Sequence, residues 1–299
     1  KGIRITANLE EALTLSARMD KPATHFVIGL APDGGRLPGE ARMTVINAIN
    51  MGLNVDSGLH DFLTDDPEIL QLAGEKKVEI RDIRKTPPRN LLHFFTGEIE
   101  TVKCLKIALL GTDSAVGKRT TAWILVHALR KAGYTTELIG TGQTAWLQGA
   151  RYSMIMDSVI NDFVSGEIEF AMVSAWKEVR PDVMIIEGQG SLLNPAYPGG
   201  FEILAAGRPD KVILQHAPAR IEYDGFPGFI IQPLNKQIEA IEVISGKPVI
   251  AITINHENLD DNGIKEAASK IHKETGLPAF DVLKYGAGGL IDLIIKHII

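Results

Sequence analysis

Short apolar runs alternate along the chain with longer amphipathic segments, and turns containing glycine separate the two. Apolar runs of about four to eight residues are typical of strands buried on both faces of a parallel sheet. Segments in which apolar residues recur every three or four positions are typical of helices that cover such a sheet. The alternation therefore predicts repeated βαβ units, and hence an α/β fold with mostly parallel sheets.

The first third of the chain contains three predicted strands with helices between them. The strands are residues 25–30, 53–56 and 78–83, and the helices are residues 40–51 and 67–76. A polar stretch with two prolines, residues 84–90, then interrupts the pattern, as is typical of a linker. We place the start of the linker there and the domain boundary near residue 100, which predicts domains at residues 1–100 and 101–299.

The remaining two thirds repeat the same pattern. The predicted strands are residues 105–110, 136–139, 183–186, 211–215, 248–254 and 279–283. The predicted helical segments are residues 118–132, 153–178, 263–275 and 288–298. The last helix is rich in apolar residues, so it either packs within its own domain or contacts a partner chain. The second alternative would make the protein a homo-oligomer.

Composition places the chain among ordinary globular proteins. Its 299 residues exceed the usual size of one domain, about 100–150 residues, and 45% hydrophobic residues can fill a sizeable core. A net charge of −6 argues against nucleic-acid binding, which needs a basic surface to neutralise phosphates. No apolar stretch approaches the roughly 20 residues that span a bilayer, and residues 3–8 lack the apolar core of a signal peptide. We therefore expect a cytoplasmic protein that acts on a small molecule.

The single cysteine, Cys104, lies inside the apolar run of residues 102–110. One cysteine cannot form an intrachain disulfide, and the sequence has no cluster of Cys and His with zinc-binding spacing. We expect Cys104 to be a small buried hydrophobic residue.

A glycine-rich loop follows the predicted strand 105–110 and precedes a predicted helix. Its sequence is Gly111-Thr112-Asp113-Ser114-Ala115-Val116-Gly117-Lys118-Arg119-Thr120-Thr121. Strand, turn and helix in this order let backbone N–H groups and the helix N-terminus point at an anion, and a lysine adds a positive charge. The loop therefore predicts a site for a phosphate-bearing ligand. Its predicted residues are Gly111, Asp113, Ser114, Ala115, Val116, Gly117, Lys118, Arg119, Thr120 and Thr121.

Two features distinguish this loop from the common phosphate-binding pattern. Five residues separate Gly111 from Gly117 rather than four, and this longer spacing resembles the loop of dethiobiotin synthetase and its relatives. Arg119 stands where a Ser or Thr hydroxyl usually holds magnesium. Either Thr120 takes over that role, or the protein neutralises the phosphates without a tightly held metal. The ligand is then ATP with magnesium, or another adenine nucleotide such as coenzyme A.

A carboxylate ends the next apolar strand of the predicted sheet. Glu187 follows residues 183–186 and begins the element Glu187-Gly188-Gln189-Gly190, which resembles one in dethiobiotin synthetase-like proteins. The carboxyl ends of parallel strands line the crevice where such sheets bind ligands. Glu187 can hold magnesium, accept a proton or orient a ligand there, and Gln189 and Gly190 are predicted substrate contacts.

Three further side chains are candidates at the same edge of the sheet. Gln143 follows the strand 136–139 in a Thr-Gly-Gln-Thr element, which is either a ligand contact or plain turn chemistry. Asp157 is either a catalytic base or a helix cap. His216 follows the strand 211–215, where an acid or base can act, although a lone histidine is more often structural.

The chain resembles the D-glutamate N-acetyltransferase-like family over nearly its whole length. The matching motifs are Gly34-Gly35-Arg36-Leu37-Pro38, Val55-Asp56-Ser57-Gly58-Leu59-His60-Asp61-Phe62-Leu63, Asp113-Ser114-Ala115-Val116-Gly117-Lys118 and Glu187-Gly188-Gln189-Gly190. The resemblance implies a Rossmann-like N-terminal domain and a P-loop C-terminal domain. It also implies acetyl transfer from acetyl-coenzyme A to the amino group of D-glutamate.

Such a transfer needs a base that frees the attacking amine and donors for the developing oxyanion. Glu187, Asp157 and His216 are the candidate bases, and the backbone N–H groups of residues 188–191 are candidate donors. A substrate carboxylate would pair with an arginine, for which Arg36 and Arg151 are the candidates. The alternatives are an ATP-dependent ligase or kinase resembling dethiobiotin synthetase, and a nucleotide-binding protein without catalysis.

Overall fold

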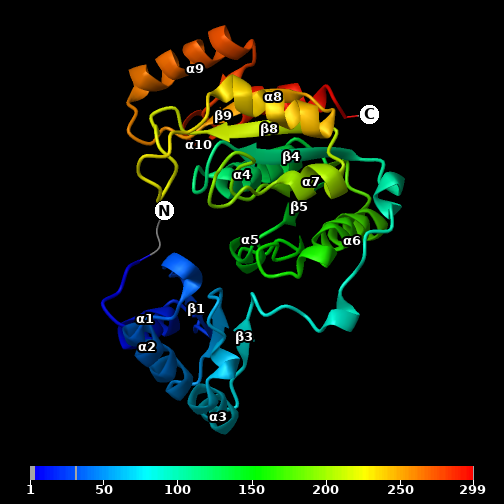
Figure 1. Cartoon of the computed structure of the whole chain (residues 1–299). Coiled ribbons are helices and arrows are strands. Elements are labelled where there is room, and N and C mark those ends of the chain that lie inside the picture. Colours follow the sequence, from blue (N-terminus) through cyan, green and yellow to red (C-terminus); the bar gives the residue numbers. More distant parts are fainter. Residues whose placement is uncertain (1–3, 31, 299) are drawn as a thin grey trace. The chain divides into compact units, whose positions relative to one another are not determined.

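The computed structural model describes residues 4–30 and 32–298, which form two compact units. The first unit is Lys1–Pro87 and the second is Pro88–Ile299. In Figure 1 the first unit is coloured blue to cyan, and the second continues from cyan to red. The division falls within the polar stretch 84–90, and residues 88–100 belong to the second unit rather than to the first domain of the sequence-based division.

The first unit is a three-stranded parallel sheet with helices between its strands. The strands are β1 (His25–Ile28), β2 (Asn54–Ser57) and β3 (Ile80–Asp82), in the order β1-β2-β3. The helices are α1 (Leu9–Arg18), α2 (Gly39–Asn50) and α3 (Pro67–Lys76), with short 3-10 turns at Asp33–Gly35 and Leu63–Asp65. Strand β1 ends two residues earlier than the pattern predicts.

A small apolar core joins the helices of the first unit to its sheet. Val45 and Ile49 from α2 and Ile69 from α3 pack with Val55 of β2. Helix α3 begins where Asp66 accepts hydrogen bonds from two backbone N–H groups, with Pro67 at its first position. The sequence pattern did not predict α1, which has no buried residue in this structure.

Residues 88–100 pack on α6 (Asn161–Val179) of the second unit. The carboxylate of Glu169 accepts hydrogen bonds from the N–H and hydroxyl of Thr96 and from the N–H of Ile99. The ring of His93 stacks on Phe170 at 3.6 Å between centroids. A side chain at Gly166 would clash with the carbonyl of His93, so the two backbones approach closely. These contacts explain why the unit boundary precedes residue 88.

The second unit contains a seven-stranded parallel sheet in the order β10-β9-β8-β4-β7-β5-β6. Its strands are β4 (Leu105–Gly111), β5 (Thr136–Gly140), β6 (Tyr152–Ser153), β7 (Val183–Glu187), β8 (Lys211–His216), β9 (Val249–Ile254) and β10 (Ala279–Phe280). Its remaining helices are α4 (Lys118–Lys131), α5 (Gln143–Leu147), α7 (Phe201–Gly207), α8 (Leu234–Ser245), α9 (Asp261–Thr275), α10 (Val282–Tyr285) and α11 (Gly288–Ile295), with 3-10 turns at Arg89–Leu91 and Glu98–Thr101.

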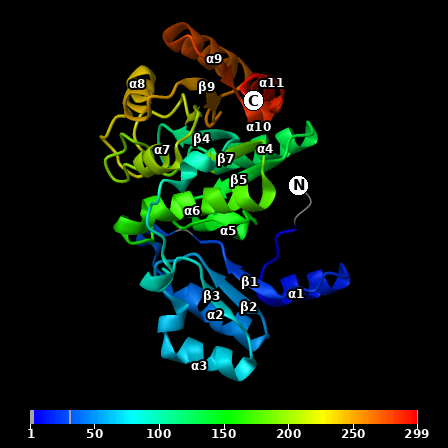
Figure 2. The ribbon, with the colours of Figure 1, turned by 90° about the vertical axis from the view of Figure 1, so that its right-hand side faces the viewer.

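Alternating side chains of the strands face opposite layers of helices. Ala108 and Leu110 of β4 belong to the core under α6, α7, α8 and α9. Ile107 and Leu109 belong to the core under α4 and α11. The strand is therefore buried on both faces, as its unbroken apolar sequence predicts. Figure 2 shows these helices on either side of the sheet.

Two predicted elements differ from the structure. Residues 153–178 are not one helical segment, because residues 152–156 extend along β5 and α6 begins only at Asn161. Met154 and Met156 donate backbone hydrogen bonds to Gly140 and Thr141 there. The predicted strand 279–283 stops at Phe280, because the side chain of Asp281 caps α10. Helices α5, α7, α8 and α10 were not predicted.

The apolar C-terminal helix is buried in its own unit. Leu290, Ile291 and Ile294 of α11 pack in the core beneath α4. Cys104 is buried, as predicted, and burial raises the pKa of its thiol to about 11. Across the part of the chain that the structure describes, no helix combines the length and the apolar character that crossing a membrane requires.

Candidate functional site

The glycine-rich loop connects the central strand of the large sheet to α4. Strand β4 lies between β8 and β7, ends at Gly111, and is followed by α4 beginning at Lys118. Gly117 caps the helix with φ of 99°, in the left-handed region that side chains rarely adopt. A side chain at Gly111 would lie 2.9 Å from the Lys118 side chain. The backbone of the loop therefore requires glycine at position 117, and a side chain at position 111 would displace that of Lys118.

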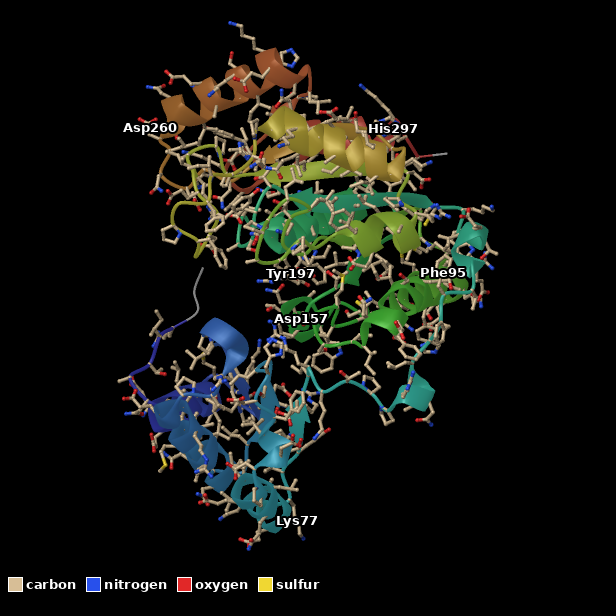
Figure 3. All side chains as sticks on the ribbon, viewed as in Figure 1. Lys77, Phe95, Asp157, Tyr197, Asp260 and His297 are labelled. Atoms are coloured by element: carbon tan, nitrogen blue, oxygen red, sulfur yellow. The ribbon has the colours of Figure 1, made fainter. Side chains whose placement is uncertain are left out.

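A pocket of about 540 Å³ lies over this loop. Its other walls are the residues that follow β7, together with Asp157 and Tyr197, which Figure 3 labels. The lining residues are Ser114, Ala115, Val116, Gly117, Lys118, Arg119, Thr120, Asp157, Glu187, Gly188, Gln189, Gly190 and Tyr197. The structure thus brings the loop and the Glu-Gly-Gln-Gly element to one cavity at the carboxyl ends of β4 and β7.

The ammonium group of Lys118 bridges the two sides of this pocket. Its Nζ donates hydrogen bonds to the carbonyl oxygen of Asp113 at 2.7 Å and to that of Gly190 at 2.8 Å. Burial lowers the pKa of Lys118 to about 8, and the charges of Asp113 and Glu187 oppose that shift. Lys118 is therefore mostly protonated at pH 7 and holds positive charge at the base of the cavity.

Glu187 is a buried carboxylate in the wall of the pocket, with only 3% of the residue exposed. The backbone N–H of Thr141 donates to its Oε2 at 3.3 Å, and Nη1 of Arg119 lies 3.9 Å from its Oε1. Burial raises the pKa of Glu187, while Arg119, the Thr141 hydrogen bond and Lys118 act in the opposite direction. A carboxyl group in this environment holds a proton more readily than one in water.

Asp113 supports the loop from below and does not line the pocket. Its Oδ1 accepts from the N–H of Ser114 at 2.7 Å and from Nδ2 of Asn194 at 2.9 Å. Its Oδ2 accepts from Nη1 of Arg220 at 2.9 Å and from the N–H of Asp224 at 2.8 Å. The side chain is fully buried, so it is not positioned to contact a ligand.

The predicted phosphate-binding residues thus divide into two groups. Residues 114–120 line the pocket. Gly111, Asp113 and Thr121 do not; the hydroxyl of Thr121 donates to Oε1 of Gln215 at 2.6 Å inside the sheet. Thr121 is therefore a structural residue of α4 rather than a ligand contact.

The three candidate bases do not all line the same pocket. Glu187 and Asp157 line the pocket. His216 lines a different hollow, formed with α8 and α9, and its Nδ1 lies 3.0 Å from the hydroxyl of Thr112. Burial lowers the pKa of His216 to about 4, with a smaller contribution from Lys270, so its imidazole is neutral at pH 7. Its position corrects the expectation that His216 faces the loop's ligand.

The predicted substrate contacts are only partly brought together. Gln189 and Gly190 line the pocket, and Nε2 of Gln189 donates to the hydroxyl of Thr141 at 2.9 Å. Gln143 is the first residue of α5 and is not among the residues that line the pocket. Arg151 is exposed, pairs with Glu178 at 2.5 Å and lines another hollow. Arg36 belongs to the first unit, and its predicted role in the site stays a prediction.

One predicted oxyanion donor is already engaged. The N–H of Gly188 donates to the carbonyl of Leu109 at 2.9 Å, which ties β7 to β4. A side chain at Gly188 would clash with that same carbonyl. The amide of Gly188 is therefore part of the sheet and is not available to a ligand.

Three residues at the site were missed by the sequence analysis. Asn194 and Arg220 hold Asp113, and Tyr197 lines the pocket. All three lie in loops that follow the carboxyl ends of β7 and β8. Their position after those strands was the signal that could have indicated them, because Asn194 and Tyr197 lie beyond the Glu-Gly-Gln-Gly element and the segment around Arg220 carries no motif.

The described ranges, 4–30 and 32–298, contain no group of three or more His, Cys, Asp or Glu side chains arranged to hold a metal ion. Thr120 and Glu187, the two predicted magnesium ligands, both line the pocket. Magnesium brought by a nucleotide at these residues stays a prediction.

Family models match almost the whole chain. The P-loop domain described as "Domain of unknown function (DUF1611_C)" matches residues 93–291, and the Rossmann-like domain of DUF1611_N matches residues 1–86. The chain belongs to the DUF1611 family. A crystal structure of a DUF1611 family protein from Anabaena variabilis superposes with a TM-score of 0.88 at 31% identity, covering 99% of this chain and 85% of that one.

Two curated relatives carry the name D-glutamate N-acetyltransferase. The relative from Tritonibacter scottomollicae is 29% identical over 294 residues, which cover 94% of this chain and 84% of the relative. The relative from a Pseudoalteromonas species is 30% identical over 276 residues, which cover 90% and 80% of the two chains. The family resemblance and the Rossmann-like and P-loop architecture of this DUF1611 member are thereby confirmed.

Proposed function

We propose that the protein is an acyl-coenzyme A-dependent N-acetyltransferase that acts on a small acidic amino acid, with D-glutamate as the first candidate. The two relatives named D-glutamate N-acetyltransferase support this proposal, since they align with most of the chain. The observation that carries it is the pairing of Arg119 with buried Glu187 inside the loop pocket. Arg119 thus supplies a positive charge to the pocket from the position in the loop where a magnesium-binding hydroxyl commonly stands.

The lining of the pocket fits the phosphates of coenzyme A. The loop turns through Ala115 and Gly117, both with positive φ, and α4 begins immediately after them. Backbone N–H groups at such a helix start favour anionic oxygen atoms. Lys118 and Arg119 supply two positive charges, which compensate a diphosphate without requiring a metal.

Acetyl-coenzyme A, when bound, supplies an acetyl thioester whose carbonyl carbon is the electrophile. The carboxylate of Glu187 is the base that we assign to the acceptor: one of its oxygens would take a proton from the amino group as the nitrogen attacks the carbonyl carbon. The C–S bond would then break, and the departing coenzyme A thiolate would receive that proton from Glu187 and leave as free thiol. The raised pKa of Glu187 makes it a stronger base than an exposed carboxylate, and Arg119 favours the ionised form that the step requires. Asp157 is the second candidate, on the exposed rim of the same pocket.

An ATP-dependent ligase or kinase is the alternative function, and one observation favours it. Thr120 is exposed at the start of α4 and lines the pocket with Glu187, so the two oxygens can belong to one magnesium site. This alternative predicts that ADP forms during turnover. A nucleotide-binding protein without catalysis would instead bind its ligand without any product.

Free thiol released from acetyl-coenzyme A tests the proposal directly. The protein is mixed with acetyl-coenzyme A and, in separate reactions, with D- and L-forms of glutamate, aspartate, glutamine and alanine. We expect thiol release with an acidic acceptor and an N-acetylated product by mass spectrometry, and neither with Lys118→Met. Absence of thiol release with every acceptor, in protein that binds coenzyme A, rejects acetyl transfer.

A further inference from the structure

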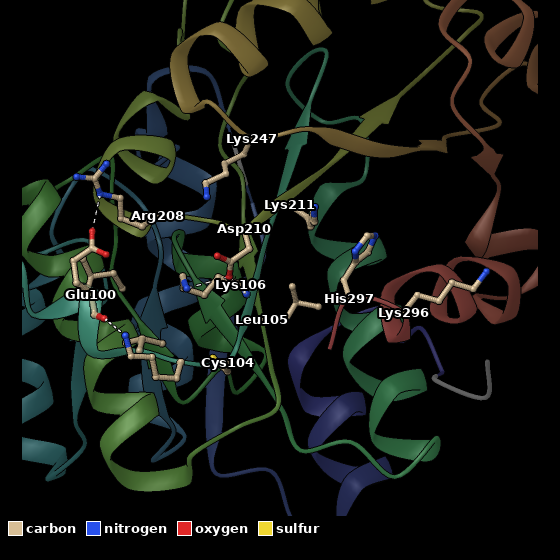
Figure 4. Close-up of a pocket in the computed structure, with 13 residues that line it drawn as sticks. Glu100, Cys104, Leu105, Lys106, Arg208, Asp210, Lys211, Lys247, Lys296 and His297 are labelled. Carbon is tan, nitrogen blue, oxygen red and sulfur yellow. Dashed lines mark hydrogen bonds and ion pairs between the residues drawn. The ribbon is translucent and has the colours of Figure 1, made fainter. Parts of the chain in front are cut away.

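A second cavity, of about 760 Å³, lies at the end of the large sheet opposite to the glycine-rich loop. Its walls include Leu105 and Lys211, at the starts of β4 and β8, and Lys247, in the turn before β9. The loop pocket follows the carboxyl ends of the same parallel strands. The two cavities are therefore separated by the length of the strands, and this second cavity, shown in Figure 4, has no part in the proposed acetyl transfer.

Positive charge is concentrated around this cavity. The cationic lining residues are Lys103, Lys106, Arg208, Lys211, Lys247 and Lys296. The acidic lining residues are only Glu100 and Asp210. The cavity thus carries a local positive charge in a chain whose net charge is −6, and such a charge attracts an anion.

Both acidic residues are already paired. Nζ of Lys106 lies 3.0 Å from Oδ2 of Asp210, and the same oxygen accepts from the N–H of Lys106 at 2.9 Å. Nε of Arg208 lies 3.3 Å from Oε1 of Glu100. The two carboxylates therefore compensate two of the cations and leave the rest.

Four cations of the lining, Lys103, Lys211, Lys247 and Lys296, form no ion pair within residues 4–30 and 32–298. Of these, Lys103 donates to the backbone carbonyl of Glu100 at 2.8 Å, so Lys211 and Lys247 are the ammonium groups that we consider for a ligand. Lys211 begins β8, and Lys247 lies just before β9. In Figure 4 the side chain of Lys247 extends toward the Lys106–Asp210 pair, whereas that of Lys296 extends away from it. Two uncompensated ammonium groups at one cavity match the charge of a phosphate group, about −1.5 to −2 near neutral pH.

His297 borders the same cavity and responds to its positive charge. Burial lowers the pKa of His297, and the charge of Lys211 lowers it further. Both effects favour the uncharged imidazole, whose N–H can donate a hydrogen bond to an anion.

We propose that this basic cavity is a second anion-binding site, which binds a small molecule through a phosphate group held between Lys211 and Lys247. Lysine is suited to phosphate because its ammonium is a compact point charge with three donors. The site is distinct from the glycine-rich loop, and its occupancy does not depend on which reaction the loop pocket supports.

Pyrophosphate titration in the Lys118→Met protein tests this site, since that change disables the loop pocket. We expect calorimetry to detect binding to the Lys118→Met protein, and the added changes Lys211→Gln and Lys247→Gln to weaken it at least about tenfold, the effect of one lost charge-assisted contact. The matched control is Lys265→Gln with Lys273→Gln, which removes the same charge from exposed positions on α9.

The titrations distinguish binding at this cavity from binding elsewhere on the protein. Binding that is lost with the Lys211 and Lys247 changes but kept with the α9 changes supports the site. No binding to the Lys118→Met protein, or equal loss in both double variants, overturns it. Melting curves of each variant confirm folding, and Lys247→Gln alone, at an exposed position, provides a milder variant that should still weaken binding.

Discussion

Arg220 reaches across from the segment after β8 and donates from Nη1 to Oδ2 of Asp113 at 2.9 Å. The same nitrogen donates to the carbonyl of Ser114 at 2.8 Å, so one guanidinium fixes two consecutive loop residues. Its other nitrogens form a two-point pair with Glu257. Hydrogen bonds to Glu257 and Asp113 raise the pKa of Arg220, which keeps it charged. The shape of the glycine-rich loop thus depends on a buried ion pair beneath it.

Asp113→Asn is expected to destabilise the protein by about 3–5 kcal/mol, the usual cost of removing one charge from a buried pair. The remaining amide cannot accept all four hydrogen bonds, and Arg220 has only 13% of its side chain exposed. Thermal or urea denaturation measures the effect. Glu98→Gln is the control, because its pair with Lys177 is exposed and its loss should cost no more than about 1 kcal/mol. Similar losses in both variants would contradict the structural role of Asp113.

Glu187→Gln is expected to lower kcat by about 10²- to 10⁴-fold, the range for a lost general base, while coenzyme A binding is retained. Asp157→Asn should have a small effect, since Asp157 is the exposed member of the two candidates. The pH profile provides a second readout. Because burial raises the pKa of Glu187 and the base must be ionised, kcat/KM should fall on the acid side at a pH above the ordinary carboxyl range. If Asp157→Asn is the inactive variant, the base is assigned to the wrong residue.

Anion binding at the loop should weaken as the pH rises through about 8. The pKa of Lys118 is lowered to about 8 from its ordinary 10.5, so the ammonium is present below that pH and lost above it. Adenosine 3′,5′-bisphosphate is a suitable probe, because its phosphates, with a second pKa of about 6, stay ionised from pH 7.5 upwards. Calorimetric titrations between pH 7 and 9.5 measure the change. The Lys118→Met protein should bind the bisphosphate weakly at every pH. If the affinity of the wild type does not change with pH, Lys118 is excluded as the phosphate contact.

Much of the fold could be predicted from the sequence because its central strands are buried on both faces. The run from Leu105 to Leu110 is apolar without interruption, and a glycine-rich loop follows it, so the strand, loop and helix were all predicted. Edge elements carry weaker signals. Strand β6 is two residues long and lies at the edge of the sheet beside β5, and the sequence pattern instead predicts a helical segment from residue 153.

The site was predicted in part for a similar reason. Glu187 ends a strand and the glycine-rich loop follows one, and both line the pocket. His216 also ends a strand, yet it lines a different hollow, which strand position alone does not determine. Arg220 and Asn194 act through Asp113 from long loops, and contacts between such distant segments leave no local pattern in the sequence.

The most direct test is whether the loop holds coenzyme A through Arg119 without magnesium. Calorimetric titration with coenzyme A and with ATP, each in EDTA and in excess magnesium, compares the wild type with Arg119→Ser. We expect the wild type to bind coenzyme A equally well with and without the metal, and Arg119→Ser to bind it about 10- to 100-fold more weakly, as for one lost charge-assisted hydrogen bond. Two results together would contradict the proposal and favour an ATP-dependent enzyme. The first is ATP binding that requires magnesium, and the second is coenzyme A binding that is absent in the wild type or unchanged in Arg119→Ser.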